Sequence, residues 1–441
     1  MAFHFIGIKG TGMAALACIL HDEHFDVTGS DIEKYIFTQD GLEERGIPFT
    51  TFDPANIKDG DTVIIGLSFD ETHPEVKAAL DNPSVRTIYY NDYLGELLTR
   101  YQSICVAGTH GKSTTTGLLA SCLQEEYPTG YLIGDGHGHM PEDAKYFILE
   151  SCEFQRHFLA YHPDYAIITN IELDHVDYYH DMEDYISAFQ SFADQVQKGL
   201  VYCGDDPWLP GLDYKVPAYS YGLSDACDYQ ARDVEQDENG TRYSVYFKGE
   251  KLADVAISEA GKPFLWNSLG TFALCHMLGE DTAKIVAGLQ AFKGIARRFN
   301  EEKAGESVLV DDYAHHPTAI EYMIEAVRQK YPHLPVVALY KPDRYSRLQY
   351  FLDRFASSLA AADHVFLLDF PKNAVREDET ITVTIDDLKE RIPGAELIEI
   401  DQAGADRLKA LGPAAYLFMS SKDIYLLRDL LRADIDGQPE D

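Results

Sequence analysis

Short apolar runs alternate along most of this chain with segments whose apolar residues recur at helical spacing. A polar or glycine-rich turn follows most of the runs. Short apolar runs are typical of parallel strands that are buried on both faces. We therefore predict an α/β protein, with strands at 3–8, 62–67, 85–90, 104–107, 146–149, 165–168, 308–310, 336–339, 365–368 and 416–419, and helices at 13–20, 74–80, 113–123 and 266–278.

The predicted elements divide the 441 residues into three domains. We place a small α/β domain at 1–100, a central domain at 101–297 and a further α/β domain at 298–441. Residues 200–260 differ from the rest because apolar and polar positions alternate there, with turns at Asn239-Gly240 and Lys248-Gly249. This pattern predicts an antiparallel insertion in the central domain.

Composition narrows the class of protein. The net charge of −36 disfavours nucleic acid and anionic membranes, and we expect neither as a partner. The seven cysteines include no C-x-x-C pair, which indicates reduced thiols. The sequence shows no signal peptide and no run long enough to span a membrane. We expect a soluble cytoplasmic protein, in which a local basic site or a metal meets any anionic ligand; no oligomeric state follows from the sequence.

The strongest candidate for chemistry is GTHGKST at 108–114, between a predicted buried strand and a predicted helix. Glycines let backbone N–H groups turn toward an anion, and the helix start adds the positive end of its dipole. Lys112 would reach the β- and γ-phosphates of a nucleotide, and the Ser113 hydroxyl would hold Mg²⁺. The full P-loop pattern has a further glycine where Val106 stands, so this is a shortened form.

A second glycine loop follows the first predicted strand. Gly7, Gly10 and Gly12 precede a helix, and Asp31 follows about 20 positions on, which is the layout of dinucleotide-binding domains. The spacing is G-x-x-G-x-G and not G-x-G-x-x-G, so NAD is disfavoured and a nucleotide diphosphate is the better ligand. An ordinary turn between strand and helix is the alternative.

Acidic residues and a histidine follow two strands of the central domain. Glu150 and Glu153 come after one strand, and Glu172, Asp174 and His175 come after another. Ligands of open α/β sheets bind at the carboxyl ends of strands, so we expect these groups near the phosphate loop. Carboxylate and hydroxyl oxygens suit Mg²⁺ with ATP, while Asp174-His175 read alone is equally compatible with a helix cap.

Several longer stretches, taken together and in order, carry a family resemblance. They are FIGIKGTGM at 5–13, GSDIEK at 29–34, GTHGKST at 108–114, RHFLAY at 156–161, PDYAI at 163–167, TNIE at 169–172 with Asp174 and His175, and DDYAHHPT at 311–318. With these stretches the chain resembles the Mur ligases, in the form typical of Gram-positive bacteria. The resemblance extends over all three predicted domains.

The resemblance implies an architecture and a reaction. The fold would be the three-domain Mur ligase architecture, with a Rossmann-like N-terminal domain, a central P-loop ATPase domain and a Rossmann-like C-terminal domain. The reaction would be ATP-dependent ligation of L-alanine to the carboxylate of UDP-N-acetylmuramate through an acyl phosphate, with Mg²⁺ as cofactor. The residues implied are Gly7, Gly10, Thr11, Gly12 and Asp31 for the UDP-sugar; Gly108, Thr109, His110, Gly111, Lys112, Ser113, Thr114, Asn267 and Asp312 for ATP; Ser113, Glu150 and His175 for the metal; Lys112, His175 and Arg298 for catalysis; and Arg344, Arg347 and His315 for the amino acid.

Three places depart from the family pattern. Pro263-Phe264 stands where the family usually has His-Asn, although Asn267 is in place. Asp343 replaces a histidine before the first of the paired arginines, and SSKD at 420–423 replaces a G-A-G-D stretch. These departures bear on ATP and amino-acid binding and not on the fold.

Three other functions remain open. The chain could ligate a different amino acid or a peptide to the same UDP-sugar, or it could be a non-catalytic paralogue that binds UDP-sugar or ATP. A nicotinamide dehydrogenase would match the first glycine loop alone, but it has no use for a phosphate loop and a metal cluster.

Overall fold

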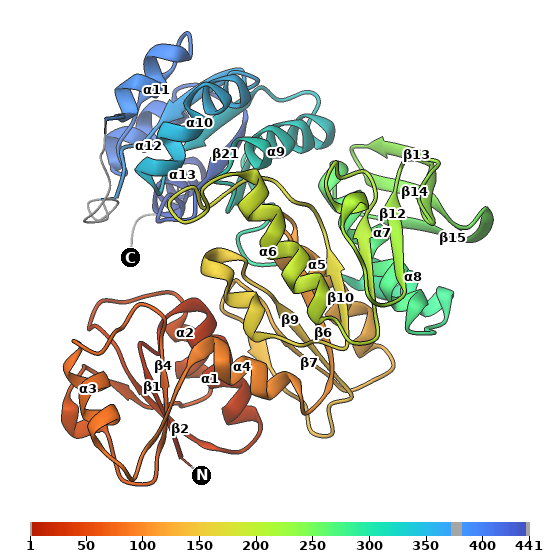
Figure 1. The fold of residues 1–441 in the computed structure, drawn as a ribbon. Coiled ribbons are helices and arrows are strands. Elements are labelled where there is room, and N and C mark those ends of the chain that lie inside the picture. Colours follow the sequence, from red (N-terminus) through yellow and green to blue (C-terminus); the bar gives the residue numbers. More distant parts are fainter. Residues whose placement is uncertain (1, 372–381, 438–441) are drawn as a thin grey trace.

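The computed structural model describes residues 2–371 and 382–437. Figure 1 shows three α/β units in chain order, from red and orange through yellow and green to blue. Each unit is built on its own sheet. The α/β class with three sheet-based units that we predicted is therefore confirmed.

The first sheet is parallel throughout, in the order β3-β2-β1-β4-β5. Its core strands are apolar and buried on both faces, as expected for parallel strands that helices cover. The strands are β1 (Ala2–Ile6), β2 (Asp26–Ser30), β3 (Phe49–Thr50), β4 (Thr62–Ile65) and β5 (Arg86–Tyr89). The helices are α1 (Thr11–Asp22), α2 (Gln39–Glu44), η1 (Pro54–Asn56), α3 (Pro74–Asp81) and α4 (Tyr90–Leu98).

The second sheet has ten strands, in the order β15-β14-β13-β12-β11-β10-β6-β9-β7-β8. Its strands are β6 (Gln102–Ala107), β7 (Thr129–Leu132), β8 (Gly138–His139), β9 (Tyr146–Glu150), β10 (Tyr165–Ile168), β11 (Gly199–Cys203), β12 (Ala218–Gly222), β13 (Tyr229–Asp237), β14 (Gly240–Phe247) and β15 (Glu250–Ile257). Its helices are α5 (Lys112–Gln124), η2 (Phe154–Ala160), α6 (Met182–Gln195), η3 (Leu209–Gly211), α7 (Lys262–Met277) and α8 (Thr282–Ala291).

The antiparallel insertion predicted at 200–260 is confirmed only for β13 to β15. Strands β11 and β12 instead pair in parallel and extend the main sheet. Leu200 and Val201 are completely buried, which is the environment of a parallel strand between helices. A second difference is that α7 begins at Lys262 and not near 266, because Pro263 is favoured in the first turn of a helix.

The third sheet has the order β16-β17-β21-β18-β19-β20, and only its edge strand β16 is antiparallel within the described residues. Its strands are β16 (Asn300–Ala304), β17 (Ser307–Asp312), β18 (Val336–Tyr340), β19 (His364–Leu367), β20 (Glu396–Leu397) and β21 (Ala415–Met419). Its helices are α9 (Pro317–Lys330), α10 (Tyr345–Leu359), α11 (Ile385–Arg391), α12 (Gln402–Lys409) and α13 (Tyr425–Asp436). Across the described part of the chain, no helix has the length and apolar character needed to cross a membrane.

The three units meet at two seams. At the first seam Gly138 of β8 lies against the backbone of Ala15 in α1, and Gly95 of α4 lies against the Ala160 carbonyl of the central unit. At the second seam, charged side chains connect the central unit to the third. Arg347 of α10, for example, pairs with Asp174, at 2.8 Å between Nε and Oδ1.

Candidate functional site

A cavity of about 760 Å³ lies at the second seam. It is bounded by the phosphate loop, by the segments that follow β9 and β10, by the first turns of α7, and by the β17–α9 connection of the third unit. A cavity at the carboxyl ends of parallel strands and between domains is the usual position of a ligand site in α/β proteins. Lining residues predicted from the sequence are Thr109, His110, Gly111, Lys112, Ser113, Thr114, Glu150, His175, Asn267, Arg298, Asp312 and His315.

The phosphate loop joins β6 to α5, as predicted. Gly108 and Gly111 both have positive φ angles, at 140° and 81°, which side chains rarely tolerate. A Cβ atom on Gly111 would lie 2.5 Å from the Asn267 Oδ1 atom, and one on Gly108 would overlap the Thr169 hydroxyl. Both glycines are therefore required by close packing as well as by backbone conformation.

Lys112 is the first residue of α5, and its ammonium group is bound inside the cavity wall. Its Nζ atom lies 2.8 Å from Glu153 Oε2 and donates to the Gly108 and Thr109 carbonyls at 2.5 and 3.1 Å. Burial by itself lowers the pKa of Lys112, but Glu153, Cys152 and Glu150 together outweigh it, and the pKa is raised above its ordinary value. A charged ammonium at the start of a helix is suited to binding phosphate.

Glu153, which the sequence placed near the phosphate loop without a role of its own, is the carboxylate that binds Lys112. It is almost fully buried and also lies 3.6 Å from His175, measured between Oε1 and Nε2. Burial raises the pKa of Glu153, but Lys112 and His175 together lower it by more than burial raises it. The pKa is therefore below its ordinary value. The E-S-C-E stretch at the end of β9 was the available signal, because its second glutamate follows the same strand end.

The three residues expected to hold Mg²⁺ all line the cavity. The Ser113 hydroxyl accepts a hydrogen bond from Arg298 Nη2 at 3.2 Å, and Glu150 Oε2 accepts one from the Gly134 N–H at 2.5 Å. His175 has a positive φ of 52° and does not cap a helix. The Ser113 hydroxyl and the Glu150 carboxylate are oxygen donors of the kind that Mg²⁺ prefers and so fit the ion, whereas the His175 imidazole is an unusual ligand for it.

Asp312 and His315 stand at the end of β17, where the third unit meets the cavity. Each Asp312 oxygen accepts one hydrogen bond, from the Phe299 and Ala314 N–H groups at 2.8 and 2.7 Å, and can still accept another. Burial raises the pKa of this carboxyl. For His315, burial together with the charge of Arg347 lowers the pKa to about 4, so the ring is neutral near pH 7.

The paired arginines lie differently from what the resemblance implies. The Arg347 guanidinium is bound on one side by Asp174, at 2.8 and 3.2 Å, and on the other by Asp343 Oδ1, at 2.7 Å. Among the described residues that line the cavity, neither Arg347 nor Arg344 is present. Arg344 occupies the N-cap position of α10, and its side chain makes no capping hydrogen bond there. Asp343 is one of the departures from the family pattern. Its carboxylate therefore already pairs with an arginine that was expected to bind the amino-acid carboxylate.

The glycine loop of the first unit joins β1 to α1, as predicted. Gly7 has a φ of 86°, Gly10 is the N-cap of α1 and Thr11 is its first residue, while Gly12 packs against the ring of Tyr90. Asp31 follows β2 and accepts a hydrogen bond from the Lys9 N–H at 2.8 Å, so it shapes the loop from within. This loop lies outside the large cavity, but Gly136 of the central unit approaches Thr11 and Thr38. Residues 134–138 thus connect the first glycine loop to Glu150.

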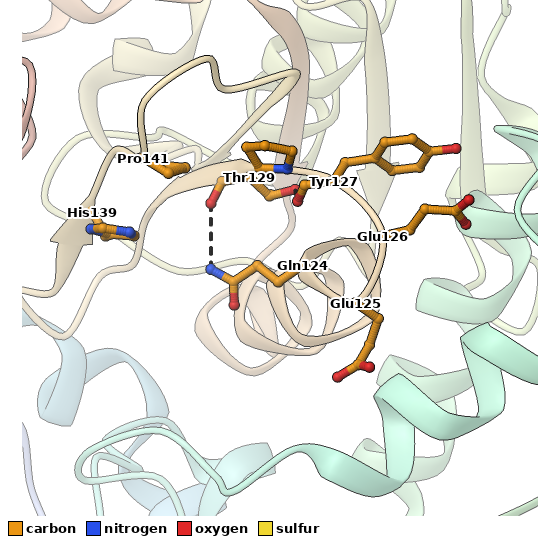
Figure 2. A pocket seen from close by; sticks show the side chains of 8 residues that line it. Gln124, Glu125, Glu126, Tyr127, Thr129, His139 and Pro141 are labelled. Atoms are coloured by element: carbon orange, nitrogen blue, oxygen red, sulfur yellow. Dashed lines mark hydrogen bonds between the residues drawn. The ribbon is translucent and has the colours of Figure 1, made fainter.

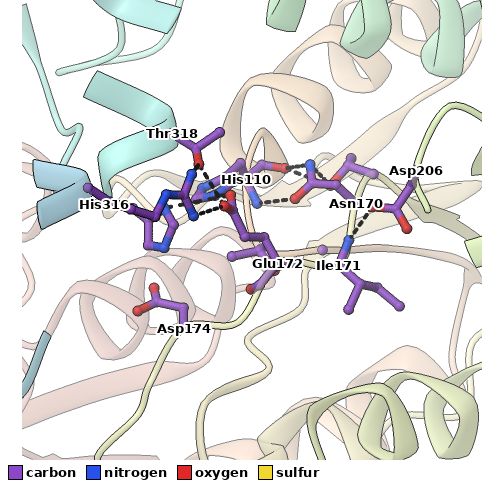
Figure 3. A network of polar contacts seen from close by, with 12 residues as sticks. His110, Asn170, Ile171, Glu172, Asp174, Asp206, His316 and Thr318 are labelled. Carbon is purple, nitrogen blue, oxygen red and sulfur yellow. Dashed lines mark hydrogen bonds and ion pairs between the residues drawn. The ribbon is translucent and has the colours of Figure 1, made fainter. Parts of the chain in front are cut away.

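A polar cluster at the seam was only partly anticipated (Figure 3). His110 Nε2 lies 2.9 Å from Glu172 Oε2, and His316 Nδ1 lies 3.6 Å from the same oxygen. Glu172 Oε1 accepts hydrogen bonds from the Thr318 hydroxyl at 2.6 Å and from Arg354 Nη1 at 2.8 Å. Burial, followed by the neighbouring His110, lowers the pKa of His316 to about 3. We assigned His316 no role from the sequence, although it belongs to the DDYAHHPT stretch at 311–318.

A second hollow, of about 310 Å³, lies at the opposite end of α5 from the phosphate loop (Figure 2). Its wall contains Glu125, Glu126 and Tyr127, and no lysine or arginine is among its described lining residues. An anionic substrate would be repelled there. The cavity at the second seam is therefore the candidate active site.

Three family models match consecutive parts of the chain. They are the Mur ligase family catalytic domain at 2–102, the Mur ligase middle domain at 106–275, and the Mur ligase glutamate ligase domain at 297–422.

Solved structures match over nearly the full length. UDP-N-acetylmuramate-alanine ligase MurC from Thermotoga maritima is 24% identical with a TM-score of 0.81, covering 99% of this chain and 100% of that one. Murein peptide ligase Mpl from Psychrobacter arcticus is 24% identical with a TM-score of 0.74 and full coverage of both chains. MurF ligase from Thermotoga maritima, in complex with ADP, is 17% identical with a TM-score of 0.66, covering 88% of this chain and 97% of that one. These likenesses and the three family models agree with the three-sheet fold and the phosphate loop, and the chain belongs to the Mur ligase family of ATP-dependent, amide-forming ligases of peptidoglycan synthesis.

Proposed function

We propose that the protein joins L-alanine to the carboxylate of UDP-N-acetylmuramate, with ATP as co-substrate. The observation that carries the proposal is the convergence of Lys112, Ser113 and Glu150 on one cavity that the third unit closes. The likeness to an alanine ligase over the full length supports the choice of amino acid. A nucleotide-sugar substrate and ATP are consistent with the cytoplasmic location that we expected.

The reaction has two steps. A carboxylate oxygen of the sugar attacks the γ-phosphorus of ATP, and ADP leaves. The uncharged amine of alanine then attacks the acyl carbon, its nitrogen releases one proton to solvent, inorganic phosphate leaves, and an amide bond remains. Neither step needs a covalent bond to the protein, so catalysis consists of positioning and charge stabilisation.

The cavity residues supply those two functions. Lys112 would neutralise charge on the transferring phosphoryl group, and Arg298, which already reaches the Ser113 hydroxyl, would contact the γ-phosphate. Ser113, Glu150 and His175 would hold Mg²⁺, which neutralises phosphate charge when bound. Asn267 and Asp312 would contact the nucleotide, and the first glycine loop would bind the UDP moiety.

A second candidate function is addition of a different amino acid or a peptide to the same UDP-sugar. Two observations favour it: the pairing of Arg347 with Asp343, and the similar full-length match to a murein peptide ligase. A free arginine pair suits the carboxylate of a small amino acid, whereas an arginine that is already paired weakens that argument.

Phosphate release with ATP, Mg²⁺ and UDP-N-acetylmuramate separates the candidates when it is assayed across the amino acids and a short peptide. Release that depends on L-alanine supports the proposal, and release that depends on another acceptor supports the second candidate. Absence of release with every acceptor, while UDP-sugar still binds, would indicate a non-catalytic paralogue.

The same assay tests the phosphate loop. Lys112→Ala should lose about 10³-fold or more in turnover, on the scale of other charges that neutralise a transferring phosphoryl group. UDP-sugar binding by the first unit should persist. Lys198→Ala is the matched control, because Lys198 pairs with Asp164 and is not among the cavity's described lining residues. If Lys112→Ala keeps more than about a tenth of wild-type turnover, the assignment of the loop is wrong.

Glu150→Ala tests the metal assignment. The variant should need more Mg²⁺ for half-maximal turnover, because one oxygen ligand is lost while the fold is kept. Titration of Mg²⁺ in the phosphate-release assay measures this shift. An unchanged requirement would remove Glu150 from the metal site.

A further inference from the structure

Two histidines and a glutamate from three different elements converge at the seam between the central and third units (Figure 3). His110 belongs to the phosphate loop, Glu172 follows β10, and His316 is the N-cap of α9. Their ligating atoms all lie within 4.8 Å of one another. All three residues line the large cavity, so the cluster is accessible to a small ion.

His316 is the member of the cluster that is hardest to explain by packing alone. Its side chain is 1% exposed, and neither Nδ1 nor Nε2 has a hydrogen-bond partner. Buried polar atoms nearly always have a partner, so an imidazole with two unpaired nitrogens calls for a ligand. Its Nδ1 atom already faces Glu172 Oε2 at 3.6 Å.

Both distances from the histidines to Glu172 Oε2 are near those of a metal site, and all the ligating atoms lie within 4.8 Å of one another. Bonds of about 2.0–2.2 Å to zinc in a tetrahedral arrangement separate neighbouring ligand atoms by about 3.3 Å. The 3.6 Å contact between His316 and Glu172 is close to this value. The 2.9 Å contact between His110 and Glu172 is a hydrogen bond, in which an ion would take the place of the shared proton.

Outer contacts fix the orientation of the cluster. Thr318 and Arg354 both donate to Glu172 Oε1, which leaves Oε2 directed at the two histidines. The backbone N–H of His110 donates to Asn170 Oδ1 at 2.9 Å and so fixes the loop that carries the imidazole ring. Supporting hydrogen bonds of this kind accompany metal ligands in general. Arg354 is half-exposed and can turn toward solvent when positive charge arrives.

We propose that His110, Glu172 and His316 bind a divalent transition metal of the zinc type, separate from the Mg²⁺ expected at Ser113, Glu150 and His175. Imidazole nitrogens favour such metals over Mg²⁺, which prefers oxygen ligands. Because two ligands come from the central unit and one from the third, the ion connects the two units at the cavity. This inference does not depend on the ligase reaction, since it concerns metal binding in the absence of any substrate.

The test is titration of the chelator-treated full-length protein with Zn²⁺ by calorimetry, and with Co²⁺ by visible absorption. Wild type should bind Zn²⁺ at this site, and Co²⁺ should give the intense spectrum of a low-coordinate site. His316→Gln should weaken binding at least tenfold, since even changes to outer contacts of a metal site cost about 10–100-fold. His137→Gln is the matched control, because that ring is largely exposed and lies outside the cluster.

Three outcomes would overturn the proposal. They are absence of Zn²⁺ binding by wild type, undiminished binding by His316→Gln, and displacement of Zn²⁺ by Mg²⁺ at a similar concentration. The cluster would then be a purely polar contact between the units. If His316→Gln fails to fold, Glu172→Gln, which keeps the side-chain shape, replaces it with the same expected loss.

Discussion

The two seams of the molecule differ in their closest contacts. The first and central units meet through close backbone contacts, Gly138 against Ala15 and Gly95 against the Ala160 carbonyl, and also through Asp22, which pairs with His139 at 2.9 Å. The central and third units meet through long charged side chains, among them Arg347 with Asp174 and Arg354 with Glu172. Close backbone packing therefore adds to polar contacts at the first seam, whereas long charged side chains make the named contacts of the second.

The difference fits the position of the candidate active site. The large cavity lies at the charged seam, where an anionic nucleotide or a metal would change the balance of charge that holds the units together. An exposed ion pair such as Arg354 with Glu172 can be rearranged at modest cost, whereas a close backbone contact either fits or clashes. The charged seam is thus the one suited to respond to ligands.

Arg347→Ala should have the largest effect on the charged seam. The arginine is 5% exposed, and its removal would leave Asp174 and Asp343 buried without their partner. Breaking a buried pair in this way costs about 3–5 kcal/mol in the free energy of unfolding, which urea denaturation measures. Arg391→Ala is the control, because its pair with Asp353 is exposed and should contribute less than about 1 kcal/mol. Equal losses for the two variants would show that Arg347 is not a structural contact.

Gly138→Ala tests the close backbone contact at the first seam, where Gly138 lies against Ala15. An added Cβ atom would overlap the Ala15 carbonyl oxygen, and overpacking of this kind costs about 1–3 kcal/mol in unfolding free energy. In Gly211→Ala, by contrast, the new atom meets nothing within 4 Å, so that variant should unfold like wild type. If Gly138→Ala unfolds like Gly211→Ala, the first seam is looser than its geometry indicates.

Nucleotide choice tests the wall that α7 contributes to the charged seam. Phe264 and Pro263 line the cavity where a hydrogen-bonding pair is usual, and stacking on an aromatic ring tolerates different bases. We expect kcat/KM to favour ATP over GTP by about tenfold, whereas sites that read a base edge by hydrogen bonds reach about 10⁴-fold. Ligation rates with each nucleotide measure the ratio. A preference above about a thousandfold would mean that Asn267 or the backbone reads the adenine edge.

Arg354→Ala should have the smallest effect. Its side chain is 49% exposed, and exposed ion pairs contribute less than about 1 kcal/mol to the free energy of unfolding. Salt screens such pairs, so the difference from wild type should disappear in about 1 M salt. Urea denaturation at low and high salt measures both quantities. A loss above about 2 kcal/mol that persists in salt would place Arg354 among the buried contacts of the seam.

Local motifs could be predicted well from the sequence, and contacts between distant segments could not. The phosphate loop was predictable because strand, glycine turn, lysine and helix follow one another within residues 104–123. The pairing of Arg347 with Asp174 joins residues that lie 173 positions apart, and nothing local to either one identifies the partner. The residue before the arginine pair was recognised as a departure, but its carboxylate could not be matched to Arg347 from the sequence.

The polar cluster illustrates the same limit. His110 was assigned to nucleotide binding through its loop, and Glu172 was noted as a strand-end carboxylate. Their contact with His316 forms only when the third unit packs on the central one. The sequence around each residue does not show that packing. The position of Glu153 near the phosphate loop was easier to predict, because Glu153 follows the end of β9 by only three residues.

The position of β8 has a consequence for how the chain folds. Strand β8 is the last strand on one side of the ten-stranded sheet; α1 of the first unit packs on its face, and Arg45 Nη2 of the first unit donates to the Gly138 carbonyl at 3.2 Å. An uncovered sheet edge recruits strands from other chains and promotes aggregation. During synthesis the first unit is made before the central one, so the cover for this edge is available when the sheet assembles. A fragment that begins near residue 101 would lack that cover, and attempts to study the central unit alone should therefore retain the first hundred residues.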